Sequence, residues 1–336
     1  MTRVAVVYND DAALASGGAL DAIAVQGVVS CARAVAESLA SRGHGVTLRA
    51  LVGPAREVPA LVDELDCDVV FNLVEAIGGD ARLEPAFAWL CQLRGLPYTG
   101  SRPRAMTLCL EKPLAQAVLG AHGIAVPRHG VFERGDELLG DLRFPLIVKP
   151  AREDASHGID AESVVRDETA LRRRVRHVLE LYRQPAIVEE FVDGREINAG
   201  LLAGPGGLEV LPLSEIDYSD FPPDLPRIVS YAGKWIETSR DWALTRVVAA
   251  RDLDPATRER IEATARRAFD VLGLSGYGRV DVRLDARGVP WVIDVNPNPD
   301  VSPDAGFALA AARAGLPHAE VVERIVAAAR RAGPGS

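Results

Sequence analysis

The sequence predicts an α/β protein with more than one sheet, and three observations support this prediction. Residues 1–100 alternate short apolar runs with amphipathic helical patterns, which is typical of a parallel sheet covered by helices. From residue 186 onward the strands are longer, and several follow one another without an intervening helix. The chain has 336 residues, of which 48% are hydrophobic and 25% charged, so it can fill two or three cores.

The N-terminal segment contains three strand–helix pairs. The predicted strands are 3–8, 46–51 and 68–74, and the helices that follow them are 25–41, 58–65 and 84–94. In parallel sheets, ligands bind at the carboxyl ends of the strands. The loop at 75–80, which follows the third strand and contains Glu75 and Asp80, is therefore a candidate edge of a binding site.

The rest of the chain carries helices and longer strands around one irregular segment. The predicted helices are 112–123, 168–182, 255–272 and 318–331, and the predicted strands are 144–150, 186–191, 196–203, 208–213, 277–284 and 289–296. Residues 215–242 mix Pro, Asp, Tyr and Gly without periodicity, so we expect a long functional loop there rather than an element.

Charge and composition argue against several classes of protein. Lys and Arg number 38 against 47 Asp and Glu, which gives a net charge of −9, so we expect no nucleic-acid partner and no attraction to an anionic membrane. No apolar run approaches the roughly 18 residues that a membrane span needs. The four cysteines form no CxxC pair, and we expect reduced thiols in a cytoplasmic protein.

Common nucleotide-binding and hydrolase motifs are absent from the sequence. It contains no GxxxxGK[ST], no GxGxxG after a strand, no HExxH and no GxSxG. These absences argue against P-loop, dinucleotide-binding, zincin and α/β-hydrolase mechanisms. The six histidines have no metal-ligand spacing, although His157, in a polar loop, stays open as a functional residue.

The strongest candidate site lies on a predicted hairpin near the C-terminus. Period-two alternation places Arg279 and Asp281 on one face of the first strand, and Asp294 and Asn296 share a face of the second. A two-residue turn at 287–288 would place Asp281 directly across from Asp294. Arg279 would then lie across from Asn296. Two facing carboxylates need a cation, and an oxygen-only set of two Asp and one Asn suits Mg²⁺.

The same residues could instead line a solvated sheet face, which is an ordinary place for alternating polar side chains. The apolar residues between them and the sequence Asn296-Pro297-Asn298-Pro299 favour the other interpretation. A rigid strand exit rich in potential ligands is not typical of an idle sheet edge.

Two further segments are candidates for nucleotide binding. Lys149 ends an apolar strand before the polar loop 151–158 and could hold a phosphate, although a lone lysine more often extends its charge into solvent. Residues 187–196 combine a strand, a tight turn and Glu196. They could bind an adenine through backbone groups and a ribose through Glu196, or form an ordinary hairpin, and spacing does not decide between the two.

Taken together, these segments resemble the ATP-grasp superfamily and, within it, the D-alanine–D-alanine ligase family. The resemblance covers roughly residues 68–326 and rests on 95–101, Lys112, 145–158, 188–196, Lys234, 278–281 and 294–307. It implies an N-terminal Rossmann-like parallel-sheet domain at 1–102, a small central domain at 103–190 and a C-terminal mixed-sheet domain at 191–332. ATP would lie between the last two domains.

The resemblance also implies roles for individual residues. ATP would be bound by Lys112 and Lys149 at the phosphates, by Glu189, Glu190 and Val192 at the adenine, by Glu196 at the ribose, and by Ser156 of the phosphate loop. Two Mg²⁺ ions, which Mn²⁺ could replace, would be bound by Asp281, Asp294 and Asn296. Lys234 would approach the γ-phosphate, and Arg279 would stabilise charge at the reacting carboxylate.

The reaction implied by the resemblance joins a carboxylate to an amine. ATP would phosphorylate the carboxylate, the amine would attack the acyl phosphate, and ADP and phosphate would be released. Phosphoryl transfer needs positioning and charge neutralisation more than a protein nucleophile. Residues 152–158 and 215–242 are the candidate lids that would exclude water. The resemblance also implies small-molecule substrates and allows a homodimer.

Departures from the family pattern concern the substrate side. The early Gly-Gly-Ser-x-Glu-Arg-Glu stretch is missing, with Gln26 in that region by an uncertain alignment, and the usual Leu-His-Gly is Val74-Glu75-Ala76. The phosphate-loop serine becomes Ala155, the tyrosine after the loop lysine becomes Trp235, Pro-Gly becomes Pro299-Asp300, and an expected serine falls near Ala305. A network around a first D-alanine therefore cannot form, and we predict a ligase for other amino-acid-like substrates.

The candidate substrate residues are Gln26, Glu75, Trp235, Asp300 and Asp304. The acids at positions 75, 80, 300 and 304 would favour a substrate with an ammonium or basic group. Three alternatives stay open: a genuine D-alanine–D-alanine ligase with a rearranged pocket, a non-catalytic nucleotide-binding module, and a kinase that releases its acyl phosphate. The sequence identifies neither the donor, the acceptor nor their chirality.

Overall fold

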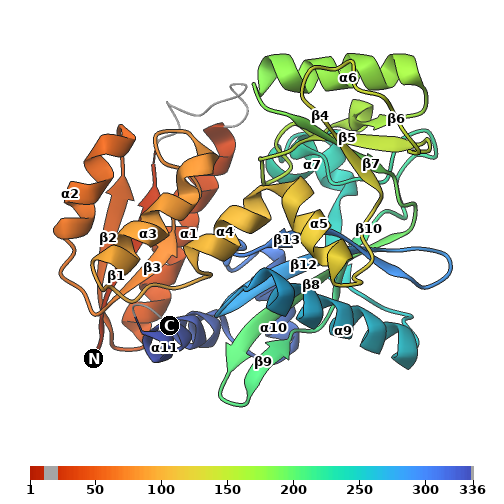
Figure 1. Ribbon diagram of the computed structural model, residues 1–336. Coiled ribbons are helices and arrows are strands. Elements are labelled where there is room, and N and C mark those ends of the chain that lie inside the picture. The colour runs from red at the N-terminus through yellow and green to blue at the C-terminus, as the bar shows by residue number, and fades with distance from the viewer. Residues whose placement is uncertain (11–21, 334–336) are drawn as a thin grey trace.

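The computed structural model describes residues 1–10 and 22–333, with side chains described from residue 27 onward in the second stretch. The described residues form three sheets, which contain β1 to β3, β4 to β7 and β8 to β13 in chain order (Figure 1). None of the helices in this part of the chain is long and apolar enough to cross a membrane.

The N-terminal sheet is parallel, as predicted, with strand order β2-β1-β3. Its strands are β1 (Arg3–Asn9), β2 (Gly45–Leu51) and β3 (Val69–Leu73). Alternation along β1 sends Val4 and Val6 to the face covered by α1 (Ala22–Ser41) and α11 (His318–Ala332). Ala5 and Val7 point to the face covered by α2 (Val58–Asp63) and α3 (Glu84–Leu93). The sheet is therefore buried on both sides, which is typical of parallel sheets.

The second sheet is four-stranded and antiparallel, with order β4-β7-β5-β6. Its strands are β4 (His129–Phe132), β5 (Leu146–Pro150), β6 (Val164–Val165) and β7 (Ala186–Glu190). One helix, α6 (Glu168–Leu181), covers it with Leu171, Val175 and Val178. The carboxylate of Asp167 caps this helix by accepting from the Ala170 amide.

The third sheet is antiparallel, with order β11-β10-β8-β12-β13 and β9 added to β8. Its strands are β8 (Arg195–Gly204), β9 (Gly207–Val210), β10 (Ser214–Asp217), β11 (Arg246–Ala249), β12 (Tyr277–Leu284) and β13 (Pro290–Asn296). One face carries α4 (Pro103–Leu110), α5 (Lys112–Ala121) and α9 (Pro255–Leu272). Phe307 of α10 (Gly306–Arg313) packs on the other face with Leu202 and Leu211.

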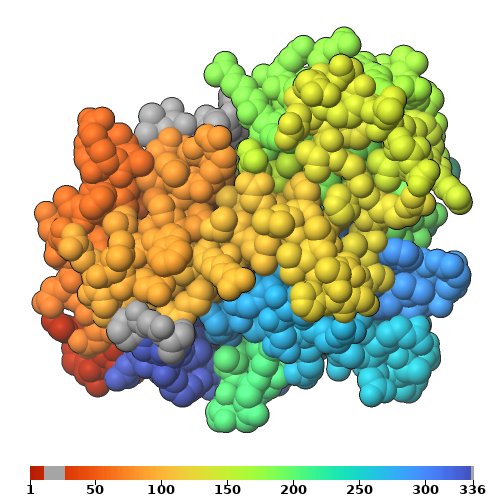
Figure 2. Space-filling view, in the orientation of Figure 1, coloured from red at the N-terminus to blue at the C-terminus, as the bar shows by residue number. Residues whose placement is uncertain are grey.

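Helices α4 and α5 connect the three parts of the fold. Figure 1 places them between the N-terminal sheet and the other two, and in Figure 2 the orange-to-yellow residues of α3 to α5 lie across the middle of the face. Their apolar residues share a core with α9 and the third sheet. The predicted domain bounds at 102 and 190 stay a prediction.

The irregular segment at 215–242 differs from its prediction as a loop without elements. It begins inside β10 and contains α7 (Tyr231–Trp235) and most of α8 (Arg240–Leu244). These elements have four or five residues each, too few for a periodic pattern to be visible. The predicted strand 208–213 is likewise divided between β9 and the approach to β10. The predicted helix at 112–123 is preceded by a separate helix, α4, which the sequence did not predict.

Candidate active site

The hairpin of β12 and β13 brings together the polar residues predicted to face one another. Asp281 pairs with Asp294, and Arg279 pairs with Asn296, as expected. The predicted turn is wrong, however, because Leu284 pairs with Pro290 and the connection has five residues. A bulge after Asp281 inserts one extra residue on β13 and restores the predicted register. The facing pairs are thus correct although the turn is not.

Asp281 is held by two partners that fix its carboxylate. Arg279 Nε and Nη2 each lie 2.8 Å from one of its oxygens, a two-point contact of the kind that guanidinium groups make with carboxylates. Asn198 Nδ2, on the neighbouring strand β8, donates to Asp281 Oδ1 at 2.8 Å. Sequence reasoning missed Asn198 because only the pairing of β8 with β12 brings it here.

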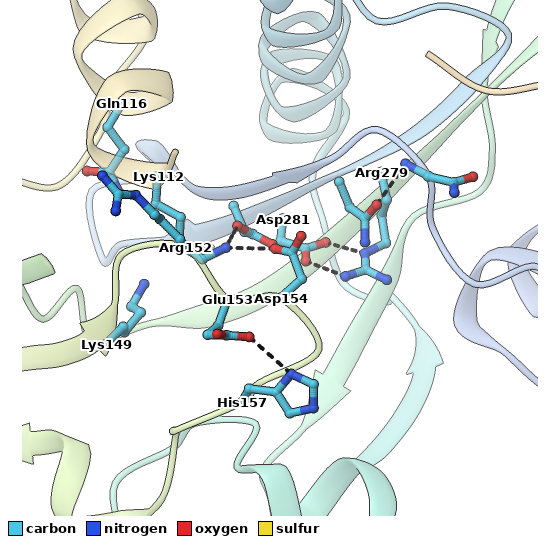
Figure 3. A network of polar contacts seen from close by, with 12 residues as sticks. Lys112, Gln116, Lys149, Arg152, Glu153, Asp154, His157, Arg279 and Asp281 are labelled. Carbon is cyan, nitrogen blue, oxygen red and sulfur yellow. Dashed lines mark hydrogen bonds and ion pairs between the residues drawn. The ribbon is translucent and has the colours of Figure 1, made fainter. Parts of the chain in front are cut away.

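Lys112, the first residue of α5, lies between two carboxylates. Its Nζ is 2.8 Å from Asp294 Oδ1 and 3.0 Å from Asp154 Oδ1 (Figure 3). Burial lowers the pKa of Lys112, but the two carboxylates outweigh burial and hold the pKa above its ordinary value. Burial raises the pKa of Asp294, but the charge of Lys112 outweighs burial and holds this pKa below its ordinary value. Both groups are therefore charged at neutral pH.

Lys149 is the penultimate residue of β5 and contacts a carboxylate of the adjacent strand β7. Its Nζ lies 2.6 Å from Glu189 Oε2, and Gln116 of α5 donates to Glu189 Oε1 at 2.6 Å. Glu189 is almost fully buried and uses both oxygens on these partners. It therefore positions Lys149 and Gln116, and any role at an adenine ring stays a prediction.

Glu196 forms a second buried cluster at the start of β8. Its Oε2 accepts from the Tyr218 hydroxyl at 2.8 Å and lies 2.7 Å from Arg283 Nη2. The Arg283 guanidinium stacks over the rings of Phe191 and Tyr218. Sequence reasoning did not select Arg283, although it continues the alternation of Arg279 and Asp281 along the same strand.

The remaining residues that were predicted to bind the nucleotide lie around these clusters. Glu190 accepts from the Arg143 amide at 3.0 Å, and Val192 follows it in the connection between β7 and β8. Ser156 lies in the loop after β5, where it and Ala155 have φ values of +63° and +55°. These left-handed conformations are costly for residues with a Cβ atom, so contacts of the loop must maintain them.

Helix α7 packs against this loop and carries two of the predicted residues. Trp235 Nε1 donates to the Ala155 carbonyl at 2.9 Å, and Lys234 Nζ lies 5.0 Å from the centre of the Trp235 ring. The rings of His157 and Tyr231 stack with their centres 5.3 Å apart. Burial, assisted by Arg279, lowers the pKa of Lys234. The two segments predicted as lids therefore contact each other.

The predicted substrate residues fall into two groups. Glu75, Trp235 and Asp300 line one small cavity of about 20 Å³, together with Gly27, Val28, Cys31, Leu73, Asn298 and Pro299. Burial and the neighbouring Asp300 raise the pKa of Glu75 to about 7.

The other candidate acids lie elsewhere. Asp304 is exposed before α10, and Asp80 caps the following turn and pairs with Arg82, so neither acid takes part in this cavity. The side chain of Gln26 lies outside the described part of the chain.

Comparisons with known proteins show the family of the chain. A family model described as D-ala D-ala ligase C-terminus matches residues 119–327. The chain is 33% identical over 263 residues to the Uncharacterized protein y4sG of Sinorhizobium fredii (strain NBRC 101917 / NGR234), covering 78% of this chain and 75% of that protein. It is 31% identical over 306 residues to a D-alanine–D-alanine ligase of Synechococcus sp. (strain JA-2-3B'a(2-13)), with coverages of 88% and 86%.

Solved structures extend the similarity to the whole fold. The D-alanine–D-alanine ligase from Bacillus anthracis complexed with ATP matches with a TM-score of 0.78 and 19% identity, over 99% of this chain and 98% of that one. The VanG D-Ala:D-Ser ligase from Enterococcus faecalis matches with a TM-score of 0.73 and 19% identity, over 97% and 99%. At these identities the structures support the fold alone.

The fold and the site define an ATP-grasp enzyme that forms carbon–nitrogen bonds at the expense of ATP. Within that class, the chain belongs to the D-alanine–D-alanine ligase family. The family assignment therefore agrees with the resemblance found in the sequence.

Proposed function

We propose that the protein joins an amino-acid-like carboxylate to an amine through an acyl phosphate, and that its substrates are not two molecules of D-alanine. One observation carries the chemical part of this proposal. Asp281 and Asp294 face each other across the hairpin, while Arg279 and Lys112 contact them from either side. A module that only binds a nucleotide has no need of this arrangement.

The nucleotide would bind where these contacts converge. Lys112 and Lys149 would hold its phosphates, and Glu196 Oε1 would meet a ribose hydroxyl, because both protein partners of Glu196 contact Oε2. The ion pairs form three separate sets: Lys112 with Asp154 and Asp294, Lys149 with Glu189, and Arg279 with Asp281. The facing carboxylates of Asp281 and Asp294 oppose a free triphosphate, so the nucleotide would have to arrive with divalent cations.

Asp281, Asp294 and Asn296 fit a magnesium ion by the chemistry of their donors. They offer carboxylate and amide oxygens only, the ligands that this ion prefers. When bound, Mg²⁺ would neutralise charge on the phosphates. Asn296 Oδ1 accepts from the Asn298 amide at 2.8 Å, which orients the side chain at the strand exit.

The chain's own residues would then perform the rest of the reaction. Arg279 would stabilise charge on the reacting carboxylate, and Lys234 would approach the transferred phosphate from α7. Trp235 and Tyr231 would keep α7 against the phosphate loop, because both contact that loop. A closed site would protect the acyl phosphate from water until the amine attacks.

The substrate side favours a small cationic group. The cavity is large enough for one water-sized group, and Glu75 and Asp300 supply its two carboxylates. Cys31, Val28 and the ring of Trp235 supply apolar walls. An ammonium would relieve the repulsion between Glu75 and Asp300 that contributes to the raised pKa of Glu75.

The test of this function is a substrate screen with the purified protein. ADP and phosphate release from Mg·ATP is measured with paired D-amino acids, L-amino acids and amines, and each active well is examined by mass spectrometry. A condensed product from a pair other than two D-alanines supports the proposal. Turnover with D-alanine alone contradicts the proposed substrates, and ADP release without a condensed product contradicts ligation.

A variant tests the cationic pocket separately. Glu75→Gln should raise the KM of the accepted amino-acid substrate, because it removes one of the two carboxylates. Asp304→Asn is the matched control, since this exposed acid lies outside the cavity. If Glu75→Gln leaves the apparent affinity for every substrate unchanged, the pocket assignment fails.

A further inference from the structure

We propose that Asp154 is an internal competitor of the nucleotide: its carboxylate occupies, on Lys112, the place that a phosphate of ATP takes. This inference rests on the proposed role of Lys112 in phosphate binding. On this inference, Asp154 in the phosphate loop opposes ATP binding and weakens the affinity of the site for ATP.

The contact is specific and largely shielded from water. Lys112 Nζ lies 3.0 Å from Asp154 Oδ1 and 2.8 Å from Asp294 Oδ1, and the lysine side chain is only 10% exposed. The Lys112 amide also donates to the Ala151 carbonyl at 3.1 Å, which places the start of α5 against the start of the loop. Figure 3 shows Asp154 turned inward toward Lys112, in line with Asp281 and Arg279.

The two carboxylates on Lys112 differ in what could neutralise them. Asp294 is on β13, fixed by the sheet, and belongs to the oxygen set that would hold Mg²⁺. Asp154 belongs to a loop and is not part of that set. A phosphate that reaches Lys112 therefore meets the charge of Asp154 uncompensated, and the two anions repel each other in a poorly solvated place. ATP binds well only when Asp154 withdraws.

The backbone of the loop is strained next to Asp154. Ala155 and Ser156 follow Asp154 and both have positive φ values of 55° and 63°. Two contacts from α7 help to keep this strained arrangement: Trp235 Nε1 donates to the Ala155 carbonyl at 2.9 Å, and the Tyr231 amide donates to the Ile159 carbonyl at 2.8 Å. The Lys112–Asp154 pair is the corresponding contact on the opposite side. Releasing that pair frees the loop to relax around a nucleotide.

The neighbouring acid in the same loop provides a matched control. Glu153 Oε1 accepts from Gln184 Nε2 at 2.8 Å, and its Oε2 lies 3.6 Å from His157 Nδ1, so it faces away from Lys112. Removing its charge changes the net charge of the loop by the same amount as removing that of Asp154. Any effect peculiar to Asp154 therefore comes from its contact with Lys112.

The experiment measures the Kd of Mg·ATP by isothermal titration calorimetry for the whole protein and four variants. Asp154→Asn and Asp154→Ser should bind ATP about three- to tenfold more tightly than the parent chain, whereas Glu153→Gln should stay within twofold. Two substitutions at 154 are used so that one poorly folded variant does not decide the result. Unchanged or weaker ATP binding in the folded Asp154 variants overturns the proposal.

Lys112→Met separates this inference from the proposed function. If Lys112→Met binds Mg·ATP as well as the parent chain does, Lys112 is not a phosphate ligand and the proposed nucleotide site is wrong. If Lys112→Met loses ATP binding while Asp154→Asn and Asp154→Ser do not gain it, the site stands and only the competition by Asp154 is wrong. Equal tightening in Asp154→Asn and Glu153→Gln also overturns it, because the effect would then be one of net charge.

Discussion

Asp294 has one neighbour of opposite charge, Lys112 at 2.8 Å, and one of like charge, Asp281 across the hairpin. Neither carboxylate is stable in this position alone, because burial penalises an isolated charge by several kcal/mol. Each has a cation from a different element, α5 for Asp294 and β12 for Asp281. The charged groups of the site are thus arranged in pairs before any ligand arrives.

Asp294→Asn should abolish Mg²⁺-dependent turnover, with a loss of at least about a hundredfold, because the amide lacks the charge that would hold the metal. The fold should persist, since the new amide oxygen can still accept from Lys112. ADP release and thermal unfolding are measured together, with Asp304→Asn as the exposed control. Turnover that keeps its Mg²⁺ dependence in Asp294→Asn would remove this residue from the metal site.

Glu75 makes folding stability depend on pH in a defined window. Burial raises its pKa from 4.5 to about 7, so the folded chain binds a proton more readily than the unfolded chain does. The resulting stabilisation is present in full below about pH 4.5 and is lost as the pH rises to about 7. We expect Glu75→Gln to gain stability relative to the parent chain over this interval, by on the order of 3 kcal/mol at most. Urea unfolding of both proteins at pH 5 and pH 8 measures the difference, and an equal offset at both pH values contradicts the assignment.

At the scale of the element, the hairpin shows what a local pattern can predict. Alternation along β12 and β13 predicted the facing pair of Asp281 and Asp294 correctly. The predicted turn was too short by three residues, and the bulge compensated for the error, because an extra residue on one strand shifts the register by one. Polar alternation therefore predicted which residues face each other more reliably than turn chemistry did.

Contacts between distant strands could not be predicted in the same way. Asn198 reaches Asp281 only because β8 lies between β10 and β12, and sequence spacing does not specify that order. Asp154 reaches Lys112 across 42 residues by the path of one loop. The short helices α7 and α8 stayed hidden because one turn of helix produces no repeat. The sequence thus predicted which polar residues share one face of a strand. It did not predict Asn198 and Asp154, which reach their partners only through long-range contacts.

The contact between α7 and the phosphate loop predicts the behaviour of a lid. Trp235→Phe removes the hydrogen bond to the Ala155 carbonyl while keeping an aromatic ring over the cavity. We expect the ratio of ADP released to amide formed to rise severalfold, because a looser lid lets water reach the acyl phosphate. Trp242→Phe, in the exposed part of α8, is the control. A ratio near one in Trp235→Phe would show that this bond does not exclude water.

At the scale of the whole molecule, one face of the N-terminal sheet has its own core with α2 and α3, whereas the other face shares its core with the third sheet. Val4 and Val6 of β1 belong to the same apolar cluster as Leu202 and Tyr277 of the third sheet, with α11 packed between them. The second sheet has a separate apolar core, but Lys112 of α5 and Lys149 of β5 face the same site. A ligand at the proposed site would contact the second and third sheets, and the third shares a core with the first. Stabilisation by the ligand should therefore spread through the chain.

Mg·ATP should raise the midpoint of a single thermal unfolding transition. At a concentration of one hundred times Kd, a ligand that binds only the folded state contributes about 2.7 kcal/mol. With an unfolding entropy of about 2.1 cal/mol/K per residue, a chain of this length gains about 4 °C. Calorimetry with Mg·ATP, with ATP and EDTA, and without ligand measures the shift. EDTA should abolish most of it, because ATP without the metal meets the facing carboxylates of Asp281 and Asp294. Two transitions, of which only one responds to Mg·ATP, would show instead that part of the chain unfolds independently of the ligand site, and that the shared core does not couple all three sheets.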